Sequence, residues 1–276
     1  MAKRGKTAQS LPLQALFSAL VLLILSGCTP PSNKEFETAA AVVTTSRATA
    51  SAPRFGDSDP WEWENRAPWD YPVHGIDVSR YQGLIDWQEV AGSGIAFAFI
   101  KATEGGDLID PRFRENWFGA ARAGVARGAY HYYYFCRTPE EQARWFISHV
   151  PRDHRALPPV LDMEWSHRSP TCRLRPEPRQ VRAQMHSYLG LIGRHYGRRP
   201  VIYTTVDFYH DNELWRVRGY PFWLRSVAGH PTETYEGQNW VFWQYTGTGR
   251  VPGIAGDTDI NAFAGAYYDW LKWSGN

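Results

Sequence analysis

Short apolar runs and longer amphipathic segments alternate along residues 71–276. The short runs have the length and spacing of strands, and they lie at 74–79, 96–102, 127–135, 159–165, 200–205, 222–227, 240–246 and 257–263. The longer segments predict helices at 84–93, 111–124, 138–149 and 177–197. Strands that alternate with helices indicate a parallel sheet, and eight such strands indicate a closed α/β barrel. Short links join the last strands, so we expect the second half of the barrel to lack full helices.

The first 27 residues have the pattern of a secretory signal peptide. Basic residues at the start precede an apolar segment, 11–25, which is shorter than the roughly 20 residues that a membrane-spanning helix needs. The segment ends in Leu25-Ser-Gly-Cys28, which resembles a bacterial lipoprotein box. That resemblance implies export and a lipid anchor at Cys28. Because Thr29 and not Asp follows, it also implies the outer membrane, facing the periplasm. The alternative is an ordinary cleaved signal that releases a free enzyme.

Residues 28–70 are predicted to form a flexible tether between this anchor and the folded domain. They are rich in Ala, Thr, Ser and Pro, and no apolar period is sustained. Three tryptophans lie between positions 61 and 69, and we expect them to pack on the domain, with contact to a ligand as the alternative. Residues 71–276, roughly 200 positions, suffice for one large domain with a single core.

The charge and the cysteine content bear on whether the protein binds nucleic acid, forms a disulfide or holds a metal ion. The net charge is +2 with no basic stripe, so we expect no nucleic-acid partner. In an oxidising compartment Cys136 and Cys172 are candidates for one disulfide, since both follow predicted strands at the same end of the fold. Two buried thiols are the alternative. No CxxC or HExxH spacing occurs, so we expect neither a metal site nor a cofactor.

Asp162 and Glu164 end an apolar run and stand one residue apart. Residues i and i+2 of a strand point to the same face, so both carboxyl groups would enter one cavity. Two crowded acids cannot both ionise easily, and one of them tends to keep its proton near neutral pH. A general acid needs this property.

Two further acids, Asp77 and Asp259, are predicted to lie near the carboxyl ends of other strands, with apolar neighbours of opposite parity. Barrel enzymes carry their chemistry at the carboxyl ends of the strands, so we expect all four acids to share one cavity. A capping or turn role would explain any one of them alone. It does not explain three strands that each aim acids at the same place.

Aromatic residues on the same strands favour a sugar as substrate. Glycoside hydrolysis needs an acid, a second carboxylate and a sugar-binding cleft. The alternation of Tyr130, Tyr132 and Tyr134 predicts one inward row. A hard-cation site would need a loop of oxygen ligands, and the sequence has none.

Six segments, in order from about residue 74 to the C-terminus, resemble the Chalaropsis-type lysozymes, glycoside hydrolase family 25. They are GIDVSRYQ at 75–82, FIKATE at 99–104, GAYHY at 128–132, LDME at 161–164, WQY at 243–245 and DIN at 259–261. The resemblance implies an irregular TIM-like barrel of five β/α units followed by three strands. It also implies cleavage of the β-1,4 bond between N-acetylmuramic acid and N-acetylglucosamine in peptidoglycan glycan strands, with retention of configuration. We expect the enzyme to be a monomer.

The resemblance assigns roles to individual residues. Glu164 would be the general acid and Asp162 its partner, supported by Asp77 and Asp259. The substrate-binding residues would be Tyr81, Lys101, Tyr132, Tyr134, Tyr203, Trp223 and Gln244. One position departs from the family pattern, because Arg225 stands where many relatives have a small residue. The alternatives are a chitinase-like acetamido-sugar hydrolase and a non-catalytic lipoprotein that binds the wall.

Overall fold

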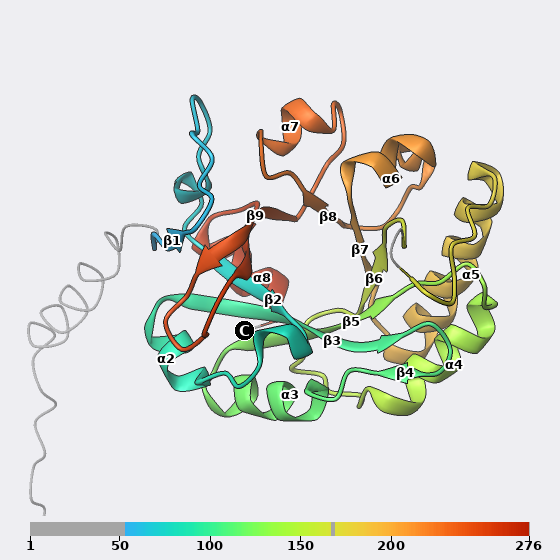
Figure 1. Cartoon of the computed structure of the whole chain (residues 1–276), viewed down its shortest axis with the longest axis horizontal. Helices are drawn as coiled ribbons and strands as arrows, with labels where there is room; N and C mark the ends of the chain where they lie inside the picture. The colour runs from blue at the N-terminus through green and yellow to red at the C-terminus, as the bar shows by residue number, and fades with distance from the viewer. Residues whose placement is uncertain (1–52, 167–168, 276) are drawn as a thin grey trace, which may run out of the picture. The chain divides into compact units, whose positions relative to one another are not determined.

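The computed structural model describes residues 53–166 and 169–275 (Figure 1). The predicted signal peptide, Cys28 and the first part of the predicted tether lie outside the described residues. Within the described part of the chain, no helix is long and apolar enough to cross a membrane.

Eight strands close into a barrel, as the sequence predicts. They are β2 (His74–Val78), β3 (Ile95–Glu104), β5 (Ala126–Tyr132), β6 (Val160–Met163), β7 (Val201–Thr204), β8 (Phe222–Arg225), β9 (Phe242–Arg250) and β10 (Thr258–Phe263). The order around the barrel is β9-β10-β2-β3-β5-β6-β7-β8, and pairing of β8 with β9 closes it. All neighbours run parallel except β10, which is antiparallel to both β2 and β9.

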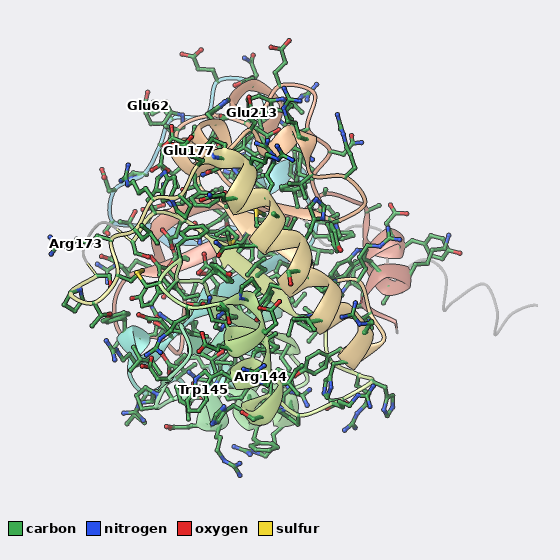
Figure 2. The ribbon with its side chains drawn as sticks, turned by 90° about the vertical axis from the view of Figure 1, so that its right-hand side faces the viewer. Glu62, Arg144, Trp145, Arg173, Glu177 and Glu213 are labelled. Carbon is green, nitrogen blue, oxygen red and sulfur yellow. A yellow bond between two sulfur atoms is a disulfide. The ribbon has the colours of Figure 1, made fainter. Side chains whose placement is uncertain are left out.

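Helices follow the first five barrel strands, and this gives five β/α units before the last three strands. They are α2 (Trp87–Gly92), α3 (Phe113–Arg122), α4 (Pro139–His149), α5 (Pro178–Tyr196) and α6 (Val206–Asp211). The helix α4 starts where the sequence predicts, because the Thr138 hydroxyl accepts from the Glu141 amide and Pro139 fills the first turn. Gly197 ends α5 in the left-handed conformation, at φ 67°. Figure 2 looks onto the side of the barrel that carries α4, with Arg144 and Trp145, and α5, which Glu177 precedes.

Smaller elements complete the chain. They are β1 (Gly56–Asp57), β4 (Leu108–Ile109), the 3-10 helices η1 (Pro68–Asp70), η2 (Arg80–Gln82) and η3 (Leu214–Arg216), and the helices α7 (Pro231–Thr234) and α8 (Tyr267–Ser274). The sequence pattern does not predict α6 or α8. Both are short, and α6 begins two residues after β7, within what reads as a loop.

The N-terminal arm, residues 53–73, lies against the outside of the last strands. Its strand β1 pairs antiparallel with β9, and Gly56 is opposite Arg250. The Trp63 ring packs edge-on against Trp243, with ring centroids 5.0 Å apart. The predicted tether is therefore too long, because residues 53–70 belong to the folded unit. These aromatic residues cover strands that have no helix of their own.

Apolar side chains fill the lower half of the barrel interior, which lies at the amino ends of its parallel strands. The cluster contains Val73, Phe97, Phe99, Val160, Val201, Phe242, Phe263 and, from α8, Trp270. Gly75 makes room for it, since a Cβ on this residue would lie 2.3 Å from Cδ2 of Phe97. Gly128 does the same for Phe99, at 2.8 Å from Cδ1. The interior of the barrel is thus packed with side chains at the amino ends of its parallel strands, and a cavity opens at their carboxyl ends.

We expect Gly75→Ala to lower the free energy of unfolding by roughly 1–3 kcal/mol, because the fully buried Phe97 ring has no space to move into. Urea unfolding followed by tryptophan fluorescence measures the change. Gly92→Ala is the matched control, since a methyl group at this helical position meets nothing within 4 Å. Equal unfolding free energies for the two variants would contradict this account of the interior.

Candidate active site

A cavity of about 320 Å³ opens at the upper end of the barrel, and the four acids singled out from the sequence line it together. Asp77 comes from β2, while Asp162 and Glu164 come from β6 and the residue after its end. Asp259 lies at the amino end of β10, contrary to the prediction that it ends a strand. It reaches the same face because β10 runs antiparallel and sets Asp259 opposite Asp77.

Strand alternation produces this gathering of acids. The neighbours of the acids in sequence, Ile76, Leu161, Met163 and Ile260, all belong to the outer core between the sheet and its surroundings. The period of two in a strand therefore sends apolar residues outward and carboxyl groups inward on three separate strands.

A chain of neutral hydrogen bonds holds Asp77. Its Oδ2 accepts from Nε2 of Gln244 and Nδ2 of Asn261, each at 2.9 Å. The Tyr203 hydroxyl donates to Oε1 of Gln244 at 2.9 Å, and Nε1 of Trp223 donates to Oδ1 of Asn261 at 2.7 Å. Tyr203 and Trp223 thus orient both amide groups so that their N–H bonds face Asp77. Burial raises the pKa of Asp77 to about 6, and the two amide donors oppose that rise.

The pKa values of Asp162, in β6, and of Glu164, the residue after β6, are raised as well. Burial raises the pKa of Glu164 to about 7, against the opposing charges of Arg225 and Lys101. The pKa of Asp162 lies well above its ordinary range, first through burial and then through the charge of Glu164. Oδ1 of Asp162 is buried and has no hydrogen-bond partner among the described residues. The carboxyl groups of Asp162 and Glu164 therefore bind protons more tightly than exposed acids do, and Oδ1 of Asp162 is an acceptor that the described residues leave unused.

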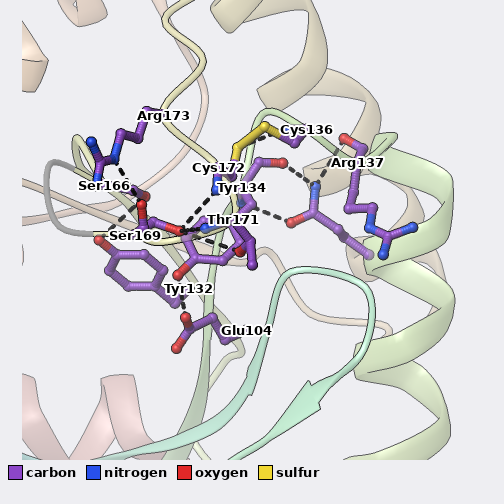
Figure 3. Close-up of a disulfide and its surroundings, with 11 residues drawn as sticks. Glu104, Tyr132, Tyr134, Cys136, Arg137, Ser166, Ser169, Thr171, Cys172 and Arg173 are labelled. Carbon is purple, nitrogen blue, oxygen red and sulfur yellow. Dashed lines mark hydrogen bonds between the residues drawn. A yellow bond between two sulfur atoms is a disulfide. The ribbon is translucent and has the colours of Figure 1, made fainter.

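The residues predicted to bind sugar separate into two groups. Tyr81, Lys101, Tyr132, Tyr203, Trp223 and Gln244 line the cavity. Tyr134 does not, because β5 ends at Tyr132 and the inward alternation ends with it. The Tyr134 hydroxyl instead donates to Glu104 (Figure 3). The other carboxylate oxygen of Glu104 lies 2.5 Å from Nζ of Lys101. Tyr134 thus contacts the cavity only indirectly, through the salt bridge between Glu104 and the cavity-lining Lys101.

Three further residues line the cavity although the sequence does not assign them to substrate binding: Gln82, Tyr130 and Arg225. Tyr130 belongs to the inward row of β5, and Gln82 lies within the GIDVSRYQ segment. Arg225 ends β8 at an inward position and also lines the cavity. The period of two would have placed it there once β8 was known. No group of three or more His, Cys, Asp or Glu side chains in the described residues is arranged to hold a metal ion.

A disulfide joins Cys136 to Cys172, with their Cα atoms 5.7 Å apart (Figure 3). It ties the loop after β5 to the loop after β6, which begins at Glu164. In that second loop the Ser166 hydroxyl donates to the Tyr132 hydroxyl at 3.4 Å. The disulfide therefore restrains the segment that carries Glu164 at a position beside Tyr132.

The sequence of the chain is similar to those of known proteins along most of the barrel. A model of the glycosyl hydrolases family 25 matches residues 76–254. The uncharacterized protein YegX of Escherichia coli K12 is 37% identical over 218 residues, which cover 75% of this chain and 77% of that protein. Lysozyme M1 of Streptomyces globisporus is 38% identical over 205 residues, covering 70% and 68% of the two chains.

Solved structures agree with the sequence comparison. A family 25 glycosyl hydrolase from Bacillus anthracis superposes with a TM-score of 0.70 at 31% identity, covering 79% of this chain and 99% of that one. A bacterial lysozyme from Streptomyces coelicolor gives a TM-score of 0.65 at 35% identity, with coverage of 74% and 97%. With the family model spanning the segments that carry Asp77, Asp162 and Glu164, the chain belongs to the glycosyl hydrolases of family 25.

Proposed function

We propose that this protein is a lysozyme that cleaves the β-1,4 bond between N-acetylmuramic acid and N-acetylglucosamine in peptidoglycan. The observation that carries the proposal is the pair Asp162, which is buried, and Glu164, which is half-buried, both with raised pKa values and both lining one cavity with aromatic residues. The similarity to the lysozymes of Streptomyces globisporus and Streptomyces coelicolor supports the choice of substrate.

Glu164 is the proposed general acid. With a pKa of about 7, a large fraction of its carboxyl groups carries a proton at neutral pH, when an exposed glutamate would be ionised. It donates this proton to the glycosidic oxygen as the bond from that oxygen to the anomeric carbon breaks. After the leaving sugar departs, the Glu164 carboxylate takes a proton from the incoming water.

The acetamido group of the muramic acid is the proposed nucleophile. Its carbonyl oxygen bonds to the anomeric carbon while the glycosidic bond breaks, and water then opens the resulting ring with overall retention. Oδ1 of Asp162 is suited to accept the acetamido N–H, since the protein offers it no other donor among the described residues. Asp77, held by two amides, and Asp259 complete the charge of the site.

Glu164→Gln is expected to lower the rate of peptidoglycan cleavage by about 10²–10⁴-fold, because the amide cannot supply the proton. Mass analysis of the muropeptides released by wild type is expected to find muramic acid at the new reducing ends. Reducing-end glucosamine, cleavage of chitin oligomers in preference, or binding to peptidoglycan without cleavage would each contradict the proposed function.

The stability of Glu164→Gln provides its control. In wild type the folded state binds the Glu164 proton more tightly than the unfolded state, whose pKa is near the ordinary 4.5. The free energy of unfolding therefore falls as pH rises from about 4.5 to 7. The glutamine variant lacks this loss and should be more stable than wild type at pH 8, by up to about 3 kcal/mol, with no such gain at pH 4. A variant destabilised at both pH values would have lost activity through misfolding.

The acetamido mechanism predicts that N-deacetylation of the muramic acid abolishes cleavage while leaving glycan binding intact. Kinetics on matched glycan strands, with and without the acetyl group, make the measurement. Isolation of a sugar ester on Asp162 from a fluorosugar trap would overturn the mechanism, because it would identify Asp162 as the nucleophile.

We further propose that the enzyme is exported as a lipoprotein, acylated at Cys28, and acts as a monomer at the outer membrane, facing the periplasm. The Cys136–Cys172 disulfide supports an oxidising compartment. Labelled palmitate should enter the full-length protein and should not enter Cys28→Ser, which should be recovered in the soluble periplasmic fraction. Membrane retention of the serine variant would contradict the anchor.

A further inference from the structure

Arg225 lines the active-site cavity, and its positive charge opposes the burial-driven rise in the pKa values of Asp77, Glu164 and Asp259. Two cations line that cavity, Lys101 and Arg225, and Lys101 is paired with Glu104 at 2.5 Å. Within residues 53–166 and 169–275, the Arg225 guanidinium has no hydrogen bond and no ion pair within 4.0 Å. Its backbone is fixed, because the Tyr235 hydroxyl donates to the Arg225 carbonyl at 2.6 Å. The free fork of donors matches the geometry of a carboxylate.

Arg225 also lines a second and larger cleft, of about 770 Å³. The N-terminal arm forms one wall of this cleft, and the segments after β8 and along β9 form the other. Gly247 lies where the two cavities meet, since a Cβ there would stand 3.2 Å from Oδ1 of Asp259 and 4.0 Å from Nη2 of Arg225. The missing side chain keeps the space between the acid site and the cleft free.

The walls of the second cleft are both apolar and polar. Trp61, half exposed, contributes an aromatic side chain. Asp57 is engaged by the Thr248 hydroxyl at 2.6 Å, and the guanidinium of Arg54 lies over Trp69 at 4.6 Å from the ring centroid. The other arginine of the cleft is thus already stacked on an aromatic ring, and Arg225 is the cation left to meet a ligand.

The chemistry of the substrate suggests what would occupy this cleft. When the anomeric carbon of muramic acid lies at Glu164, its lactyl group and the attached stem peptide leave the ring beside the acid site. N-acetylglucosamine is uncharged, whereas the stem peptide carries free carboxylates. An unpaired guanidinium next to the acids, at the entrance to a mixed apolar and polar cleft, fits the peptide better than more glycan.

We propose that Arg225 and the cleft beside the N-terminal arm bind the stem peptide of peptidoglycan, with Arg225 pairing with one of its carboxylates. The proposal rests on the proposed lysozyme function and adds to it a preference for peptide-bearing glycan. The N-terminal arm, which forms this wall of the cleft, lies outside residues 76–254 that the family model matches.

The test compares two substrates, soluble glycan strands that carry stem peptides and the same strands after an amidase has removed them. For Arg225→Ala we expect the ratio of kcat/KM on peptide-bearing strands to kcat/KM on bare strands to fall at least ten-fold. Arg225→Lys should retain part of the ratio. The ratio is the readout because Arg225 also acts on the pKa of Glu164, and that effect is common to both substrates.

A second variant leaves Arg225 in place. Ala228 is exposed and lines the cleft, so Ala228→Trp should fill it and lower the same ratio. Ala255→Trp is the matched control, because Ala255 is equally an exposed alanine but lines a different cavity, beside α2. Thermal unfolding of each variant verifies that it folds.

The outcomes separate the two proposals. If wild type cleaves neither substrate, the lysozyme function itself fails. If wild type cleaves both, and Arg225→Ala and Ala228→Trp leave the ratio at its wild-type value, peptide binding in the cleft is refuted. Slowing of both substrates equally by Ala228→Trp would assign the cleft to the glycan and would also overturn the inference.

Discussion

The cost of removing carboxylates from water governs this structure. Four acids share a small cavity above a core of phenylalanine and tryptophan, and burial is the largest cause of every raised pKa among them. The barrel offers few cations there to neutralise them. Oriented amides offset part of the cost at Asp77, and the pKa values of Asp162, Glu164 and Asp259 are raised. That same cost raises the pKa of Glu164 to about 7.

The rest of the fold serves to keep these groups in position. Phenylalanines fill the lower interior because Gly75 and Gly128 leave room for their rings, and the acids lie directly above on the same strands. Tyr203 and Trp223 pack in that core and also fix the amides that hold Asp77. Packing and electrostatics therefore act through the same side chains, so a change to either side chain affects both.

Much of this arrangement is predictable from the sequence because it follows from strand alternation. The parity of Asp77, Asp162 and Glu164 against their apolar neighbours is local, and the structure places all three in one cavity. Other features depend on contacts distant in sequence. The direction of β10 follows from its pairing with β9 and β2. The end of β5 removes Tyr134 from the inward row, and the position of the arm depends on its pairing with β9 and the packing of Trp63 on Trp243.

The pairing of β10 with β2 joins the last strand of the barrel to the first. Asn261 and Asp77, which are hydrogen-bonded, stand 184 positions apart in the chain, so closing the ring requires every strand of the barrel from β2 to β10. A nascent chain that lacks its final segment has neither the neighbour of β2 nor the amide that Asp77 needs. Synthesis of β10 therefore determines when the acid site can first form, and a copy truncated before β10 would lack the Asn261 amide that holds Asp77.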